Sequence, residues 1–354
     1  MDAAVVVVGA GPAGATAAMR LHRAGVPVVL LDRARFPRDK ICGDLLPPRT
    51  FPLLEQAGFQ PSWDPVLRRS ALLACGSVVF ERLAQQRPQA WRSSPAGVLS
   101  LTPIAEALPR RVFDALLVAQ LRQQGLVLRE GWQLTELSPD PAGGGWCLLG
   151  CCSEPAAGSR RWQLQARWVL AADGAGSRVR QLLLGAHRRV DLGIGLRVLT
   201  EQAEPEAPSE LVYPHPHSLL YRWSFQLGTQ RNQGLFRPLA SSSPAEVGAP
   251  AARLARQWFG RTGVAWACPL LPPPERLRGS PAPGVLLLGD AASLIDPLLG
   301  HGIDHAAESG LLAAECVLGS TSVEQGSDAY NAELTRVFGP RWQQLQGVIQ
   351  RQLC

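Results

Sequence analysis

The sequence predicts an α/β fold that joins a Rossmann-like domain with a mainly parallel sheet to a second domain built on an antiparallel sheet. Three observations support this prediction. Residues 4–32 read as strand, glycine-rich turn, helix and strand. Later apolar runs, starting at 168 and 285, each lead to an aspartate. Between 186 and 280, short runs of alternating apolar and polar residues are typical of antiparallel strands.

The N-terminal segment contains a complete βαβ unit with a glycine fingerprint. AVVVV is a β-branched strand, GAGPAG follows, ATAAMRLHRAG reads as a helix ended by Gly25, and VPVVLLD is a second strand. Gly9 permits a tight turn, Gly11 lets the backbone approach a pyrophosphate, and Gly14 lets the helix pack on the sheet. The strand ends at Asp32, whose carboxylate can accept hydrogen bonds from ribose hydroxyls. The unit predicts a dinucleotide site; FAD, NAD and a turn without any ligand are the alternatives at this point.

Two further aspartates follow predicted strands. Asp173 comes after WVLAA, and Asp290 ends VLLLGD, where it can hold another polar part of a dinucleotide. Beyond it, Gly300 and Gly302 precede an apolar helical segment that starts at Ile303. Small residues at a helix start let a flat ring approach, and the helix dipole stabilises the negative charge of a reduced flavin. A plain βα unit is the alternative, but it gives no reason for PLLGHGI.

Composition narrows the function classes. The 354 residues carry a formal net charge of +6 without a basic run interleaved with aromatics, which argues against a nucleic-acid partner. The eight cysteines lack paired ligand spacing and are too sparse for a disulfide framework, so we expect no metal site and a reducing cytoplasm. No segment approaches about 20 uninterrupted apolar residues, so no transmembrane span is expected. The basic charge leaves peripheral contact with an anionic membrane open.

Five motifs together resemble a known flavoprotein family. GAGPAG, FPRDKICGD, RRVFD, ADGAGSRVR and GDAASLIDPLLGHGI occur in the order seen in FAD-dependent oxidoreductases related to p-hydroxybenzoate hydroxylase. Within that superfamily, the loop FPRDKICGDLLPPR makes the chain most similar to the geranylgeranyl reductase family. The resemblance covers about residues 1–185 and 265–320. It implies FAD as the cofactor and an FAD-binding domain of the p-hydroxybenzoate hydroxylase (GR2) type.

The resemblance also places residues around the cofactor. Lys40, the only lysine in the chain, would lie with Cys42, Gly43 and Asp44 in a loop over the FAD. Its ammonium could pair there with a phosphate or carboxylate. Arg110 would contact the adenosine or pyrophosphate side. The residues expected to bind the cofactor are Gly9, Gly11, Pro12, Ala13, Gly14, Asp32, Arg33, Lys40, Cys42, Gly43, Arg110, Asp173, Asp290, Pro297, Gly300, Gly302 and Ile303.

The second domain carries an aromatic face. YRWSFQLG puts Tyr221, Trp223 and Phe225 on one side of a predicted strand, and it resembles the family's Y-x-W-x-F-P signature. The resemblance implies an apolar slot for a prenyl chain, and an ordinary core face is the alternative reading. The chain departs from the family at Gln226, where proline is usual, and at His301, where GEGI is the commoner form.

The predicted domain division is discontinuous. The composition changes between 186 and 280, where polar and proline-rich turns separate short strands. A sheet there, joined by residues near 71–100, would cap the flavin. The predicted units are an FAD-binding domain (1–70, 101–185 and 281–325), a substrate-binding β-sheet domain (71–100 and 186–280) and a C-terminal helical segment (326–354).

The resemblance implies an FAD-dependent reductase of carbon–carbon double bonds in an isoprenoid or similarly apolar substrate. Reduced flavin would deliver hydride, with Cys42 as the first candidate for the catalytic acid and His301 as the second. A second GxGxxG unit is absent, so the electron donor would be transient NAD(P)H or a small redox protein.

Two other functions stay open on the sequence. One is an FAD monooxygenase that hydroxylates or epoxidises an apolar or aromatic substrate. A halogenase is disfavoured because the W-x-W-x-I-P signature is absent. The other is a flavoprotein that only passes electrons to a partner. The sequence does not indicate an oligomeric state.

Overall fold

The structure of the protein is a computed structural model. It describes residues 3–60, 69–75, 91–93, 98–141, 143–154, 158–188, 191–201, 210–212, 220–227, 229–239, 253, 256–257, 260 and 263–353. Parts of the predicted substrate domain, including 76–90, 202–209 and 240–252, lie outside the described residues.

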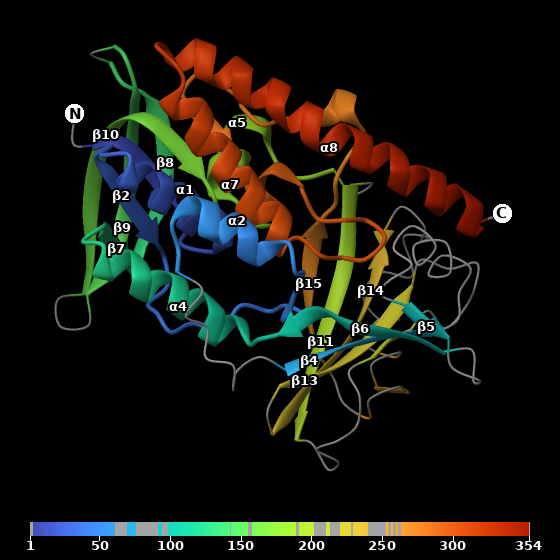
Figure 1. Ribbon diagram of the computed structural model, residues 1–354. Helices are drawn as coiled ribbons and strands as arrows, with labels where there is room; N and C mark the ends of the chain where they lie inside the picture. The colour runs from blue at the N-terminus through green and yellow to red at the C-terminus, as the bar shows by residue number, and fades with distance from the viewer. Residues whose placement is uncertain are drawn as a thin grey trace.

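The first sheet forms the core of the N-terminal half (Figure 1). Its strands in spatial order are β7 (Val127–Glu130), β2 (Val28–Asp32), β1 (Ala3–Val8), β10 (Gly158–Ala171), β9 (Trp146–Glu154) and β8 (Trp132–Pro139), with β16 (Val285–Leu287) paired to β10. The pairs from β7 to β10 and the β10–β16 pair are parallel, whereas β9 and β8 add antiparallel strands. Parallel strands covered on both faces read as continuous apolar runs, which explains AVVVV.

Helices cover this sheet and meet at small residues. They are α1 (Pro12–Arg23), α2 (Thr50–Ala57), α4 (Arg110–Gln123), α5 (Arg178–Leu184), α7 (Ile303–Leu318) and α8 (Val323–Leu353), with the 3-10 turns η6 (Pro274–Arg276) and η7 (Gly289–Ala292). At Gly310 in α7, a Cβ would overlap the carbonyl of Ala13 in α1. The absent side chain therefore lets these two helices pack closely over the central strands.

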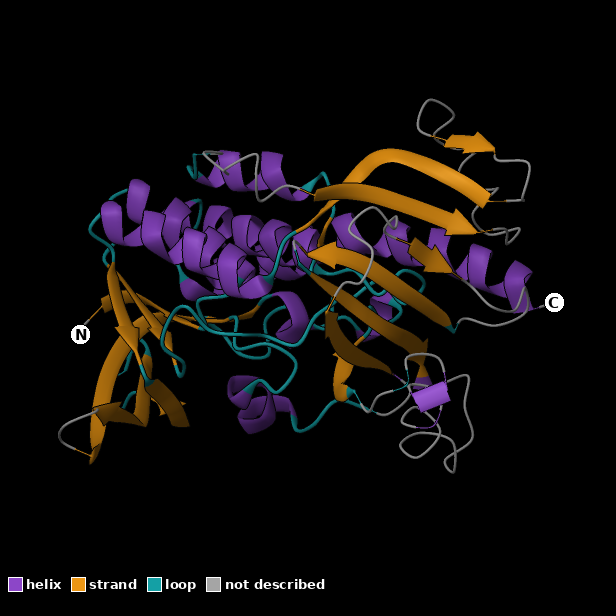
Figure 2. Ribbon diagram, turned by 90° about the horizontal axis from the view of Figure 1, so that it is seen from below, coloured by secondary structure: helices purple, strands orange, loops and turns teal. Residues whose placement is uncertain are grey.

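A second, larger sheet lies at the other end of the molecule (Figure 2). Its strands in order are β15 (Val264–Pro269), β11 (Leu192–Glu201), β14 (Gln230–Pro238), β13 (Tyr221–Leu227), β12 (Glu210–Val212), β4 (Arg69–Cys75), β6 (Val98–Ala107) and β3 (Leu45–Leu46), with β5 (Trp91–Ser93) paired to β6. All of these pairs are antiparallel except β12–β4. Buried aromatic residues of β13 and β14 form a core of their own there.

The predicted α/β fold with a second, antiparallel sheet is confirmed. The predicted strands and helices of the βαβ unit correspond to β1, α1 and β2, and the helix predicted from Ile303 is α7. The domain boundaries stay a prediction, although the boundary drawn at residue 101 falls inside β6, which pairs wholly within the second sheet. The C-terminal segment lies within α8. Among the described helices, none combines the length and the apolar content that crossing a membrane requires.

Candidate functional site

The glycine turn between β1 and α1 forms the floor of the site. Gly9 has a φ of 103°, and a Cβ there would overlap the Ala172 carbonyl. A Cβ at Gly14 would overlap the carbonyl of Gly9, so both positions need glycine for packing alone. Gly11 differs, because a Cβ there would meet only two guanidinium nitrogens, both at 3.8 Å. Its missing side chain leaves space at the start of α1, where free backbone N–H groups attract an anion.

Two arginines face this space, and one aspartate holds both. Arg110 donates from Nε and Nη2 to the Asp114 carboxylate at 2.7 and 2.8 Å, and Arg38 Nη1 lies 3.0 Å from Asp114 Oδ2. Asp114 is fully buried, and Arg110 is 3% exposed. One carboxylate cannot occupy the donors of two guanidinium groups, so donors remain for a phosphate at Gly11. Arg38 was not among the predicted residues, although its place two positions before Lys40 in FPRDKICGD was the available signal.

Asp32 at the end of β2 is held in position by the backbone. Its carboxylate accepts from the N–H groups of Ala10 and Ala34 at 2.9 and 2.8 Å. The residue is buried but still lines the cavity beside Arg33. A fixed carboxylate with remaining lone pairs is what a ribose diol needs as an acceptor.

Asp173 after β10 offers a second acceptor. Its Oδ2 accepts from the N–H groups of Arg178 and Val179 at 2.7 and 3.3 Å. Its Oδ1 is buried and has no hydrogen-bond partner in the described part of the chain. Burial raises the pKa of this carboxyl. An orphaned acceptor at the cavity wall fits a cofactor that brings a hydroxyl or amide donor.

These groups surround one cavity of about 540 Å³. Ten of the predicted cofactor residues line it: Gly9, Gly11, Pro12, Ala13, Asp32, Arg33, Lys40, Arg110, Asp173 and Asp290. The other seven, Gly14, Cys42, Gly43, Pro297, Gly300, Gly302 and Ile303, are not among its lining residues. An anion-binding turn between two carboxylate acceptors fits a dinucleotide such as FAD.

Lys40 forms an ion pair with Asp290 at the wall of the cavity. Its Nζ lies 3.0 Å from Oδ2 of Asp290 in η7, and both side chains line the cavity. The neighbouring Asp39 pairs with Arg197 of β11, which donates to its carboxylate at 2.5 and 3.2 Å. The loop is thereby tied to both halves of the molecule, and the single lysine has a specific carboxylate partner.

Asp44 fixes the same loop by accepting hydrogen bonds from two other segments. It has a φ of 62°, is 2% exposed, and accepts from the Asn232 amide at 2.7 Å and the Arg110 N–H at 3.1 Å. Burial raises its pKa to about 6, although both donors oppose the rise. The Asn232 amide also donates to the Cys42 carbonyl at 2.8 Å. Cys42 is half-buried, and this bond to Asn232 of β14 places it at the junction of the two halves.

The aromatic face of β13 supports this junction. Tyr221, Trp223 and Phe225 are all buried on one side of the strand. The Tyr221 hydroxyl donates to a loop carbonyl at 2.6 Å, and the Trp223 indole donates to Asn232 at 2.9 Å. A Cβ at Gly43 would meet Phe225 and Trp223 at 3.6–3.7 Å, so that glycine brings the loop against the rings. None of the three aromatics lines the cavity described above.

The PLLGHGI segment forms a tight turn before α7. Gly300 has a φ of 64° and packs against the Tyr221 hydroxyl. His301 lies between two aspartates, with Nδ1 2.8 Å from Asp304 Oδ1 and Nε2 3.3 Å from Asp296 Oδ2. Burial lowers the pKa of His301, but the charges of Asp304 and Asp296 outweigh that effect and raise it. His301 therefore carries a positive charge when these two carboxylates are its only partners.

Comparisons with known proteins agree with this geometry. Residues 2–195 match a family model described as an FAD binding domain. The chain is 31% identical over 333 residues to a menaquinone reductase of Mycolicibacterium smegmatis, covering 88% of this chain and 75% of that protein. It is 27% identical over 363 residues to digeranylgeranylglycerophospholipid reductase 1 of Methanopyrus kandleri, covering 97% and 87%. A geranylgeranyl bacteriochlorophyll reductase-like structure from Thermoplasma acidophilum has the same fold, with a TM-score of 0.72, 19% identity and coverage of 98% and 87%.

Proposed function

We propose that this chain reduces carbon–carbon double bonds of an isoprenoid substrate. The proposal starts from its family, because the chain belongs to the FAD-dependent oxidoreductases that include the menaquinone and geranylgeranyl reductases. Two relatives are named for reducing menaquinone and digeranylgeranylglycerophospholipids. The electron donor in this proposal is NAD(P)H or a small redox protein that binds transiently.

The residues that line the cavity would hold FAD. The backbone at Gly11, with Arg38 and Arg110, would bind the pyrophosphate, because these are the free donors at the start of α1. Asp32 would accept from the adenosine ribose. The unpaired Oδ1 of Asp173 and the carboxylate of Asp290 would accept from the remaining hydroxyls.

One observation carries the proposed reaction: the turn at Cys42 and Gly43 lies between the cavity and an apolar aromatic core. On one side the next residue, Asp44, accepts from the backbone N–H of Arg110, which lines the cavity. On the other side Gly43 packs on Trp223 and Phe225. Among the residues that the structure describes, this turn is where an apolar substrate on its way to the cofactor would meet both surfaces. We include Tyr221, Trp223 and Phe225 in the proposed substrate contact for that reason.

Bound FAD, once reduced, supplies a hydride to one carbon of the double bond. The Cys42 thiol would give a proton to the other carbon and recover it from water, so that two hydrogens are added. His301 is the second candidate for this acid. Both of its ring nitrogens lie beside carboxylates, so loss of its proton would leave Asp296 and Asp304 without compensation.

The test is a product analysis with the FAD-loaded protein. The protein is reduced anaerobically with dithionite and mixed with digeranylgeranylglycerophospholipid or menaquinone. The extracted products are reoxidised in air, which returns any quinol formed by dithionite to the quinone, and are then analysed by mass spectrometry. We expect each reduced double bond to gain two hydrogens, and in deuterated water both should be deuterium, because dithionite supplies only electrons and the reduced FAD takes its hydrogen from the solvent. FAD-free protein is the control.

Two results would reject this reaction. One is an unchanged mass with both substrates. The other is incorporation of an oxygen atom when the reduced protein is exposed to air with substrate, which would identify a monooxygenase. In the first case, rapid electron transfer to a protein partner would identify the protein as an electron carrier.

A further inference from the structure

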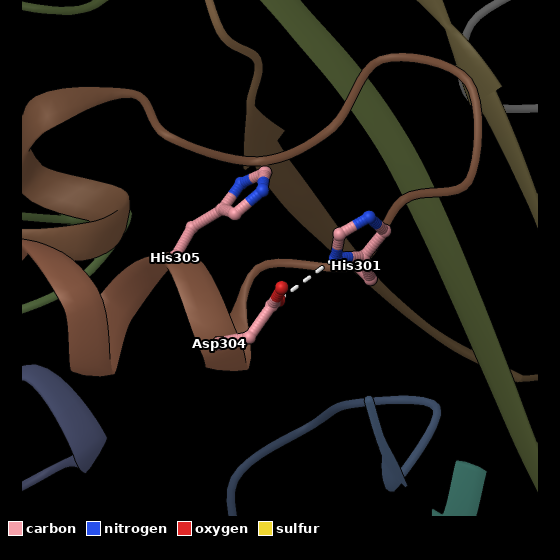
Figure 3. A group of neighbouring side chains, drawn as sticks. All are labelled: His301, Asp304 and His305. Atoms are coloured by element: carbon pink, nitrogen blue, oxygen red, sulfur yellow. Dashed lines mark hydrogen bonds and ion pairs between the residues drawn. The ribbon is translucent and has the colours of Figure 1, made fainter. Parts of the chain in front are cut away.

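A cluster of metal-ligating side chains lies at the start of α7. It consists of His301, Asp304 and His305, and each residue offers one ligand atom within 4.8 Å of the others. Figure 3 shows the two imidazole rings facing each other across the first turn of the helix, with Asp304 beside them. His301 lies in the turn just before α7, while Asp304 and His305 lie in the first turn of that helix.

His305 presents an unused nitrogen to this cluster. Its Nδ1 lies 2.6 Å from the carbonyl oxygen of Leu294, and a carbonyl can only accept, so Nδ1 carries the hydrogen. In the neutral ring Nε2 then has a free lone pair. No residue in the described part of the chain makes a hydrogen bond to that nitrogen, and His305 is only 4% exposed. A free nitrogen lone pair on a ring that a backbone carbonyl holds in place is the usual state of a metal-binding histidine.

His301 has a carboxylate at each ring nitrogen, so that one can orient the ring while the other nitrogen binds a metal. Its Nδ1 faces Asp304, while its Nε2 lies 3.3 Å from Oδ2 of Asp296. The Oδ1 of Asp296 accepts from the N–H groups of Leu298 and Leu299 at 2.7 and 2.8 Å, which fixes that carboxylate. A carboxylate behind the imidazole orients the ring and makes the facing nitrogen a better donor to a metal.

The charges in the cluster do not balance without a cation. Asp296 and Asp304 are 5% and 4% exposed, and among the described residues neither pairs with a lysine or an arginine. The next acidic residue of α7, Glu308, takes both nearby arginines, Arg49 and Arg341. Two buried carboxylates with one imidazolium keep a net charge of −1. A divalent cation with two neutral imidazoles would bring the total to zero, which lowers the cost of burial.

We propose that His301, Asp304 and His305 bind a divalent first-row transition metal ion, with Asp296 and the Leu294 carbonyl orienting the two histidines. Two imidazoles and one carboxylate suit zinc or ferrous iron better than magnesium or calcium. Bonds of about 2.0–2.2 Å place neighbouring ligand atoms roughly 3.4 Å apart. His301 Nδ1 and Asp304 Oδ1, now 2.8 Å apart, must therefore separate to admit the ion, while the ligand atoms that lie up to 4.8 Å apart must approach it. With a metal bound, His301 is no longer available as an acid, and this leaves Cys42 as the candidate. The metal site itself does not depend on the proposed reaction.

The test measures metal binding directly. Full-length, FAD-loaded protein is treated with a chelator, dialysed and titrated with Zn²⁺ by calorimetry, and Co²⁺ binding is followed by its visible absorption. We expect one ion per chain. Binding should be lost in His305→Gln and Asp304→Asn, and weakened roughly 10–100-fold in Asp296→Asn, which changes only an orienting partner. His22→Gln is the control, because His22 is half-buried and bonded to the Gln124 carbonyl, away from the cluster.

Three outcomes would overturn the site. They are wild-type protein that binds no ion, a His305→Gln variant that binds as wild type does, and a Co²⁺ spectrum with the sulfur-to-metal absorption of cysteine ligands. FAD content and circular dichroism of each variant show whether it has folded. If Asp304→Asn does not fold, His305→Gln decides the question.

Discussion

The ammonium of Lys40 lies 3.0 Å from the carboxylate of Asp290, although the two residues are 250 positions apart in the chain. The pair joins the loop after β2 to the turn after β16 at the cavity wall. It is partly exposed, with side-chain exposures of 37% and 16%. A partly exposed pair contributes little to folding, so its position beside the cavity is better explained by the ligand.

Replacing Lys40 with methionine tests that explanation. Methionine keeps most of the apolar stem and removes the charge. We expect weaker FAD binding and a loss of activity, with a change in the free energy of unfolding below about 1 kcal/mol. Fluorescence titration of FAD-free protein and urea unfolding measure the two quantities. Arg336→Met, which breaks an exposed ion pair on α8, should leave FAD affinity unchanged. Unchanged FAD affinity and activity in Lys40→Met would show that the charge of Lys40 has no role in FAD binding or in the reaction.

Changing Asp290 to alanine should weaken FAD binding by roughly 1.5–3 kcal/mol, the range for hydrogen bonds to a charged group. The double variant with Lys40→Met shows whether the lysine acts through this carboxylate. Coupled residues give a combined loss that differs from the sum of the single losses. If Asp290→Ala binds FAD as wild type does, the turn after β16 has been assigned the wrong role.

Alanine at two glycines of the same turn should have opposite consequences. Gly14→Ala places a methyl group on the carbonyl of Gly9, so we expect lower thermal stability. Gly11→Ala meets only side-chain nitrogens at 3.8 Å, so the protein should fold normally yet bind FAD poorly. Differential scanning calorimetry and FAD titration separate the two effects. A Gly11→Ala protein with full FAD affinity would contradict the assignment of the pyrophosphate to this turn.

The pKa of Asp44 predicts a pH dependence of folding. Burial raises this pKa from 3.8 to about 6, so the native state holds the proton more tightly than the unfolded state does. The stability from protonated Asp44 is fully present below pH 3.8 and is lost as the pH rises through about 6. The loss is on the order of 3 kcal/mol. In Asp44→Asn, which tolerates the positive φ, this part of the pH dependence should disappear from urea unfolding curves. Parallel curves for both proteins would show that Asp44 is ionised throughout.

Serine at position 42 tests the proposed acid. Serine is nearly as small as cysteine but a much poorer acid. We expect product formation to fall roughly 10²–10⁴-fold, the usual contribution of a general acid, while reduction of the FAD stays near normal. Stopped-flow absorption and product analysis under anaerobic conditions measure the two steps. Cys151→Ser on β9 is the matched control. Full turnover by Cys42→Ser would show that Cys42 is not the acid and that the loop has only a structural role.

The elements of the fold were predictable because each depends on residues that are close in sequence. AVVVV, the glycine turn and the helix that follows can satisfy their backbone groups in few other ways, and the strand β13 shows the alternation that buries Tyr221, Trp223 and Phe225 together. The membership of β3 and β6 in the second sheet was not predictable, because strand pairing is decided by segments far apart in the chain.

The parallel βαβ core, the antiparallel second sheet and the dinucleotide-binding turn with its terminal Asp32 follow from the residues within each segment. Which side chains become partners depends on how the folded segments meet. Arg38 joins Arg110 through Asp114, Asp44 meets Asn232, and His301 comes between Asp296 and Asp304. Periodicity reports which face of an element is buried, because burial repeats with the helix or strand geometry. The periodicity does not indicate which distant charged residue will pair with a given side chain, because that depends on where the packed elements place the loops.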